Sequence, residues 1–126
     1  MMACFEVTCD VETGIVHCRL SGFLPDTEVE ELVKELTRAI HEAKRRYGRL
    51  RLLIDNRHGE VFSRNAAAAI VVIKSFYDRM DRIAALVPTG LRKLQAERNR
   101  SEQTRVFLSE DEAMDWLRFG DEKRIG

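Results

Sequence analysis

The sequence has few of the residues, and none of the motifs, that usually carry chemistry. Its 126 residues include only three cysteines, Cys4, Cys9 and Cys18, an odd number without C-x-x-C spacing. They indicate neither a zinc site nor a disulfide framework. The chain also lacks dinucleotide-binding, phosphate-loop, serine-hydrolase and zinc-peptidase motifs. We therefore expect no metal, no cofactor and no assignable catalytic residue.

An excess of one charge and a long hydrophobic run are missing as well. Lys and Arg together number 21, and so do Asp and Glu, so no net field draws the chain to a polyanion. No apolar run approaches the roughly 20 residues that a membrane span needs. The N-terminus lacks the apolar core of a signal peptide. We therefore expect a cytoplasmic protein with no nucleic-acid partner and no membrane span.

What is present fits one folded domain. The chain is 44% hydrophobic and 33% charged, which is typical of a soluble globular protein, and its length allows a single core. We expect residues 1–120 to form this domain and residues 121–126 to be a frayed tail.

The N-terminal residues predict a β-hairpin. Residues 4–9 and 15–20 alternate between apolar and polar side chains on either side of a turn. Opposing Asp10 to Ile15 puts the apolar residues of both strands on one face. These residues are Phe5, Val7, Cys9, Val16, Cys18 and Leu20. Cys9 and Cys18 are then diagonal neighbours roughly 7–8 Å apart, too far for an unstrained disulfide, and we expect both in the core.

A strand, a polar loop and a helix follow one another in the middle of the chain. Residues 50–54 are typical of a buried parallel strand, which Asp55 ends. In open α/β sheets, ligands and partners meet the chain just beyond such strand ends. The loop at residues 55–63 is therefore the expected functional site. Ser63 is a good N-cap for a helix over residues 63–80.

That helix begins with an unbroken apolar run, residues 66–73. A helix lying on a sheet needs only one apolar stripe, so apolar residues on all sides indicate burial on more than one side. Three candidates could cover these apolar residues: neighbouring helices of the same domain, a second subunit in a homodimer, or an apolar ligand.

The other helices carry their own end signals. A long helix opens at residues 25–27, where Thr27 and Glu30 form a capping box. Ser109 and Glu112 form a second capping box ahead of the last helix. Gly120 is suited to close that helix in the left-handed conformation.

Two further strands are predicted at residues 82–87 and 104–108. The helix between them is thinly apolar, and we expect Leu91 and Leu94 to face inward. The predicted fold is therefore α/β, with four helices and a five-stranded mixed sheet formed by an N-terminal antiparallel hairpin and then parallel strands.

The chain resembles the STAS domain, named for sulfate transporters and anti-sigma-factor antagonists, and in particular its SpoIIAA-like group. The resemblance covers nearly the whole chain. Its most specific parts are the C-terminal VFLSEDEAMDWL, with Glu112-Ala113 and Trp116-Leu117, and the unit DRIAALVP. It implies a SpoIIAA-like βα superhelix and a role in protein–protein regulation or, in relatives, the binding of a small or apolar ligand.

In the antagonists of this group, a phosphorylatable serine stands at the start of the helix after the third strand. Laid on this sequence from Asp55, that motif falls on residues 63–66, and Arg64 occupies the acceptor position. Arginine cannot be phosphorylated. Ser63 lies one residue early, where a phosphate would be stabilised by the helix dipole and Arg64, but a capping role is favoured.

The polar loop contains one pair that could do chemistry, since Asp55 could orient His58 as a base. No nucleophile stands beside this pair, so turn-stabilising roles are favoured. The candidate binding residues are Asp55, Asn56, Arg57, His58, Ser63, Arg64, Ala66, Ile70, Val72 and Ile73.

Three hypotheses of function follow. The first is a non-enzymatic regulatory module that binds a protein, or a second copy of itself, through residues 55–63 and the helix at 63–80. The alternative is a binder of a small apolar or lipid-like ligand in a pocket between the second and third helices. An enzyme that uses Asp55 and His58 ranks third.

Overall fold

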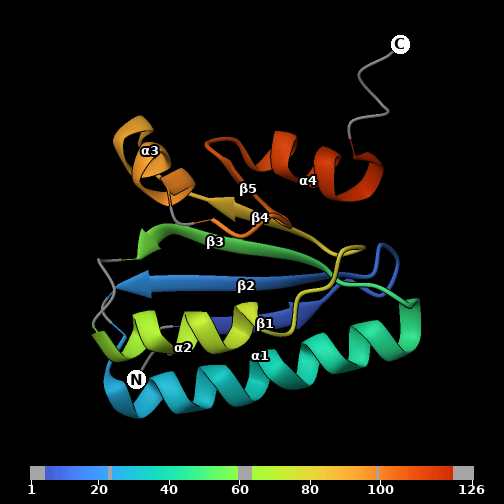
Figure 1. Cartoon of the computed structure of the whole chain (residues 1–126), viewed down its shortest axis with the longest axis horizontal. Coiled ribbons are helices and arrows are strands. Elements are labelled where there is room, and N and C mark those ends of the chain that lie inside the picture. Colours follow the sequence, from blue (N-terminus) through green and yellow to red (C-terminus); the bar gives the residue numbers. More distant parts are fainter. Residues whose placement is uncertain (1–4, 23, 60–63, 99, 121–126) are drawn as a thin grey trace.

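The computed structural model describes residues 5–22, 24–59, 64–98 and 100–120, with only the backbone described for residues 59 and 64–67. The elements alternate in the predicted order (Figure 1). The strands are β1 (Phe5–Cys9), β2 (Ile15–Gly22), β3 (Arg51–Gly59), β4 (Arg82–Leu86) and β5 (Thr104–Phe107). The helices are α1 (Asp26–Tyr47), α2 (Arg64–Lys74), α3 (Gly90–Arg98) and α4 (Glu110–Phe119). None of the described helices is long and apolar enough to cross a membrane.

The five strands form one mixed sheet in the order β1-β2-β3-β4-β5. β1 is antiparallel to β2, and every later neighbour pair is parallel. This is the predicted α/β fold class. Because β2, β3, β4 and β5 run parallel, their amino ends lie at one end of the sheet and their carboxyl ends lie at the opposite end.

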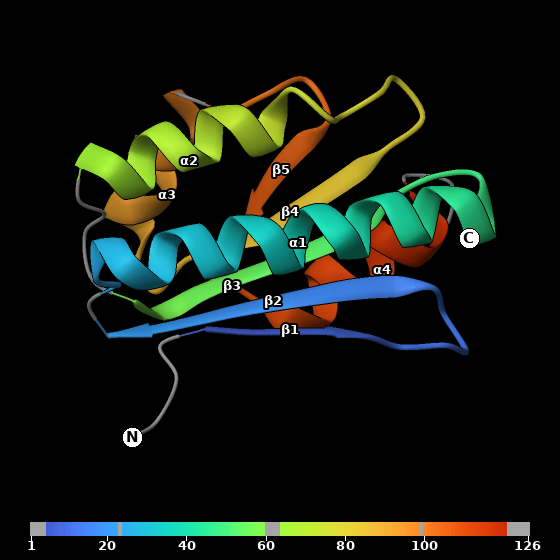
Figure 2. The same cartoon turned by 90° about the horizontal axis from the view of Figure 1, so that it is seen from below.

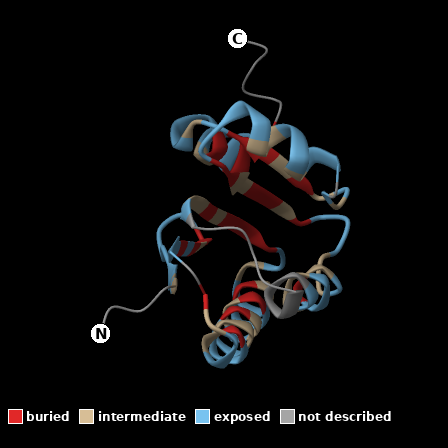
Figure 3. Ribbon diagram, turned by 90° about the vertical axis from the view of Figure 1, so that its left-hand side faces the viewer, coloured by how far each residue is buried: buried red, intermediate tan, exposed pale blue. Residues whose placement is uncertain are grey.

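Helices cover both faces of the sheet. α1 and α2 lie side by side on one face (Figure 2), over a core that includes Val16, Leu52 and Ile83. α4 packs against β3, β4 and β5 on the other face, where Trp116 and Leu117 belong to a second core cluster. The buried residues accordingly line the strands and the inner sides of the helices (Figure 3).

The predicted hairpin register is confirmed. Phe5 pairs with Leu20, Val7 with Cys18, and Cys9 with Val16. Cys18 is buried as expected, but the placement of Cys9 in the core was wrong, because its side chain is exposed. Cys9 ends β1, which pairs with β2 alone among the described strands, so no further described strand covers its thiol.

α1 begins one residue before its predicted capping box. Its N-cap is Pro25, which makes no side-chain capping bond, and the carbonyl of Pro25 accepts from the amides of Glu28 and Val29. Thr27 thus lies inside the first turn, too far along the helix to cap it, and that prediction was wrong. At the other end, the amide of Gly48 donates to the carbonyl of Lys44 at 2.9 Å in a left-handed cap.

α4 starts as predicted, since the hydroxyl of Ser109 accepts from the amide of Glu112 at 3.4 Å. Its end differs. Gly120 has a positive φ of 65° but a ψ of −149°, outside the left-handed helical conformation. The guanidinium of Arg82 lies against it, and a Cβ there would stand 2.7 Å from Nη2 of Arg82. This backbone conformation, which residues with a Cβ rarely adopt, favours glycine here. The guanidinium of Arg82 is the far end of a flexible side chain and could shift.

α2 is a helix as predicted, but it ends at Lys74 and not near residue 80. A tighter turn follows, in which the amide of Phe76 donates to the carbonyl of Ile73. Lys44 of α1 then donates to the carbonyl of Phe76. These bonds turn the chain back so that Phe76 and Tyr77 pack against the core under α1.

The expected orientation of α3 was wrong. Leu91 is 67% exposed and Leu94 is 61% exposed, whereas Arg92, Lys93 and Ala96 are half-buried. Two leucines on a nine-residue helix bury too little area to set its rotation. α3 lies against β5 with both leucines on its outward side.

Candidate functional site

The residues predicted to form a loop after the third strand continue that strand instead. β3 extends to Gly59, and beyond a register shift after Arg19 it still pairs with β2, His58 against Ser21 and Gly59 against Gly22. β2 is long enough to offer ladder partners to these residues, so their backbone groups bond in the sheet. Asp55, Asn56, Arg57 and His58 are therefore strand residues, while residues 60–63, Ser63 included, lie outside the described residues.

Asp55 is the buried charge of this strand. Arg57 holds its carboxylate with both arms of the guanidinium, Nε to Oδ1 at 2.9 Å and Nη2 to Oδ2 at 2.8 Å. The backbone amide of Arg57 also donates to Oδ1 at 3.1 Å, and Nε of Arg19 lies 3.7 Å from Oδ2. The hydrogen bonds from Arg57 lower the pKa of Asp55, although burial opposes them. Asp55 is thus a fixed anion.

Arg57 connects this strand to the last helix. Its Nη2 lies 2.9 Å from Oε1 of Glu110 in the first turn of α4. The carboxylate of Asp55, followed by Glu110, raises the pKa of the guanidinium. Two carboxylates and one arginine therefore hold the end of β3 and the start of α4 together.

The acid–base pair considered from the sequence is not formed. The carboxylate of Asp55 is occupied by Arg57, and His58 is exposed on the next part of the strand. Within the described part of the chain, no group of three or more His, Cys, Asp or Glu side chains could hold a metal ion.

Asn56 of β3 carries an unpaired side-chain acceptor among the described residues. Its Oδ1 is buried and has no hydrogen-bond partner among the described residues. A buried carbonyl without a donor costs about 1–3 kcal/mol.

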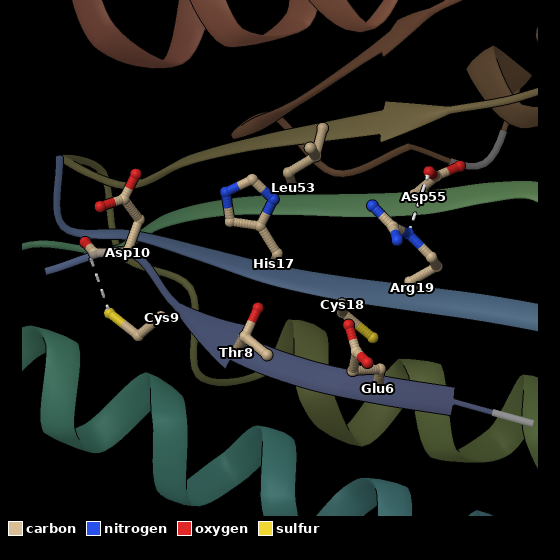
Figure 4. A pocket seen from close by; sticks show the side chains of 9 residues that line it. All are labelled: Glu6, Thr8, Cys9, Asp10, His17, Cys18, Arg19, Leu53 and Asp55. Atoms are coloured by element: carbon tan, nitrogen blue, oxygen red, sulfur yellow. Dashed lines mark hydrogen bonds and ion pairs between the residues drawn. The ribbon is translucent and has the colours of Figure 1, made fainter. Parts of the chain in front are cut away.

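A hollow of about 220 Å³ lies on the sheet face that α4 leaves open (Figure 4). His17 stands between Thr8 of β1 and Leu53 of β3, and Arg19 turns toward Asp55 at one end. The lining residues are Glu6, Thr8, Cys9, Asp10, His17, Cys18, Arg19, Leu53 and Asp55. The hollow exists because α4 packs over β3 to β5 and does not reach β1.

A second hollow, wide and shallow, runs along the outer side of α1 beside Val33, Thr37 and His41. Neither of these two hollows lies between α2 and α3, where the alternative hypothesis placed an apolar pocket.

The apolar run of α2 is only partly covered. Ile73 is buried in the core beneath α1 and Ile70 is half-buried, but Val71 is 67% exposed and Val72 is 49% exposed. The side chains of Arg64 and Ala66 lie outside the described residues. The described neighbouring elements therefore leave the outward valines exposed, and the first of the three candidate covers does not account for them within that part of the chain.

Two residues that hold the site together were not among the predicted ones. Arg19 comes from β2 and Glu110 from α4, on either side of the predicted pair Asp55 and Arg57. The hairpin phase already placed Arg19 on the polar face. The pairing of β2 with β3 that brings Arg19 opposite Asp55 is not a local property of the chain.

Comparison with solved structures supports the fold. An uncharacterised protein from Shewanella loihica with a SpoIIAA-like fold superposes with a TM-score of 0.68 at 17% identity, covering 90% of this chain and 91% of that one. Unphosphorylated SpoIIAA, an anti-sigma factor antagonist, superposes with a TM-score of 0.68 at 15% identity, covering 91% of this chain and 98% of that one. An anti-sigma factor antagonist from Mycobacterium paratuberculosis superposes with a TM-score of 0.64 at 13% identity, covering 90% of this chain and 92% of that one.

Comparison with curated proteins yields no match. The model of one protein family, SpoIIAA-like, matches residues 15–118, a span that runs from the start of β2 into the last turn of α4. The chain belongs to the SpoIIAA-like family.

Proposed function

We propose that the chain is a non-enzymatic regulatory module that binds a protein through the outward face of α2 and the neighbouring end of β3. The observation that carries this proposal is the exposure of Val71 and Val72, 67% and 49%. A cytoplasmic setting, expected from the sequence, is part of it.

The exposed residues of α2 form one stripe. Ala68, Val71 and Val72 are all exposed, and they stand at i, i+3 and i+4 on the helix. This spacing is typical of a helix face that lies in, or receives, an apolar surface. β-Branched valines have little rotamer freedom in a helix, so binding through them costs little side-chain entropy.

The similar structures agree with a regulatory role. Two of them are named anti-sigma factor antagonists, which are proteins that act on another protein. Laid on this chain without gaps from Asp55, the phosphorylatable serine of that group falls on Arg64. The proposed binding face therefore includes no phosphorylation switch at this position.

If the protein that binds α2 is a second copy of this chain, experiments on the purified protein alone can test the proposal. A charge at the centre of the stripe, Val71→Glu, should halve the mass measured by light scattering if two copies meet at α2. Val11→Glu is a matched control, because Val11 lies in the hairpin turn and is 66% exposed. This control should leave the mass unchanged.

A foreign partner is tested with the same three proteins. Immobilised wild type and Val11→Glu should retain a protein that Val71→Glu loses, while circular dichroism shows all three folded. If the three forms have the same mass and retain the same proteins, the outward face of α2 is not the binding face.

A further inference from the structure

Beyond α2, the chain has an open sheet edge. β1 pairs with β2 alone among the described strands, and no described segment lies beyond it (Figure 2). We propose that β1 pairs antiparallel with β1 of a second copy of this chain, in a register centred on Val7, which joins the two sheets into one.

The ladder with β2 shows which backbone groups of β1 are open. The amide of Asp10 donates to the carbonyl of Ile15 at 3.0 Å, so Asp10 directs its backbone groups toward β2. In an antiparallel ladder every second residue does the same, which assigns Thr8 and Glu6 to β2. The amides and carbonyls of the alternate residues, Phe5, Val7 and Cys9, therefore point outward.

β1 has few of the features that protect an open sheet edge. Natural sheets blunt such an edge with proline, a bulge, charged side chains or a covering element. β1 contains no proline, and its register with β2 is unbroken from Phe5 to Cys9. Its only charged residue, Glu6, is exposed. The opposite edge, β5, is shorter, and α3 contacts it.

The open groups permit one full-length register. A two-fold antiparallel pairing has one residue at its centre, and only Val7, the middle residue of β1, brings all five residues of the strand opposite residues of the second copy. Centring on Glu6 or Thr8 would pair three residues of β1, and centring on Phe5 or Cys9 would pair one. With Val7 opposite Val7 of the second copy, Phe5 faces Cys9 of that copy, and Cys9 faces its Phe5. Each of these pairs exchanges two backbone hydrogen bonds.

The side chains of this register are compatible. Glu6 stands opposite Thr8 of the second copy, so the only charges of the two strands do not face each other. Phe5 and Val7 are half-buried on the face that carries α1, and pairing covers more of both. Cys9 gains an aromatic neighbour, which suits its sulfur.

A charge at position 8 tests the register. Thr8 is exposed, so a substitution leaves the monomer folded, as thermal melts would verify. Thr8→Glu sets a carboxylate against Glu6 of the second copy twice per dimer, and Thr8→Lys sets an ammonium there twice. Analytical ultracentrifugation should show dimerisation about tenfold weaker for Thr8→Glu and severalfold tighter for Thr8→Lys. High salt should reduce the difference between the two variants.

Hydrogen exchange gives a second measurement that does not need a variant. With rising protein concentration, the amides of Val7 and Cys9 should become protected. Those of Glu6 and Thr8, already bonded to β2, should change little.

Several outcomes would overturn the proposal. If the wild type stays monomeric at all soluble concentrations, β1 does not pair with a second copy. The edge then either pairs with an extended segment of another protein or stays unpaired. A dimer with the same affinity in both Thr8 variants is not formed through β1. A dimer lost in Val71→Glu but unchanged in both Thr8 variants lies at α2, whereas loss in Thr8→Glu alone leaves α2 free for its protein partner.

Discussion

Arg57 of β3 and Glu110 of α4 are 53 residues apart in the chain, yet Nη2 and Oε1 lie 2.9 Å from each other. The same guanidinium binds the buried carboxylate of Asp55 with two hydrogen bonds. Glu110 lies in the first turn of α4, where a negative charge also suits the helix dipole. One arginine thus neutralises a buried acid and anchors a helix that covers half of the sheet.

Removing this arginine should destabilise the fold. Arg57→Met keeps the aliphatic stem and the backbone amide that donates to Asp55. It leaves Arg19, 3.7 Å away, as the one cationic partner of that carboxylate among the described residues. We expect a loss of about 2 kcal/mol in the free energy of unfolding, measured by urea titration. Arg45→Met removes an arginine from the exposed pair with Glu42 and should not shift the midpoint measurably. Equal effects of the two substitutions would show that the contacts of Arg57 carry no special stability.

The stability contributed by Asp55 should disappear in acid. Its pKa is lowered in the folded state, first by hydrogen bonds from Arg57, so folding favours the ionised form. This contribution is complete above the unfolded-state pKa of about 3.9. It is lost as the pH falls through the lower folded-state value. The difference in unfolding free energy between wild type and Asp55→Asn should therefore shrink below about pH 4, and a difference that grows there would contradict this account.

The two described cysteines should react at different rates. Cys9 is exposed, whereas Cys18 is buried and burial raises its pKa to about 12. The thiolate is the reactive form, so iodoacetamide should label Cys9 in the folded protein and spare Cys18. Peptide mapping by mass spectrometry distinguishes the two sites, and both should be labelled in urea. Rapid native labelling of Cys18 would show that the sheet opens beneath α1.

Gly120 should be intolerant of a side chain. Its φ of 65° and ψ of −149° form a conformation that residues with a Cβ rarely adopt, so Gly120→Ala should cost about 1–3 kcal/mol. A Cβ there would also displace the guanidinium of Arg82, whose Nη2 would stand 2.7 Å away. Gly90→Ala is the matched control, because its Cβ would have no neighbour within 4 Å. Gly90 begins α3, where alanine is the better helix former, and this variant should be neutral or slightly more stable. Thermal melts that rank the two variants in the opposite order would contradict both assignments.

Much of the architecture could be read from neighbouring residues. The alternation of β1 and β2 predicted their register down to the pair of Val7 and Cys18. The capping box at Ser109 placed the start of α4. These signals succeeded because strand periodicity and helix capping depend on residues a few positions apart.

The misses arose where a remote partner decides the outcome. Residues 55–59 look like a loop, yet β2 is long enough to bond with them as strand. Leu91 and Leu94 look like core residues, yet α3 packs against β5 with both of them turned outward. In both cases the competing contact comes from another element and leaves no mark on the local pattern.

The sequence by itself determined the element order, the mixed sheet and the absence of the common catalytic motifs, because hydrophobic period and end signals are encoded locally. Only the tertiary structure decided that Arg19 and Glu110 converge on the Asp55–Arg57 pair, that Val71 and Val72 stay uncovered, and that the outward groups of β1 remain open. Burial and charge pairing depend on which elements the folded chain brings together, and those elements are distant in sequence.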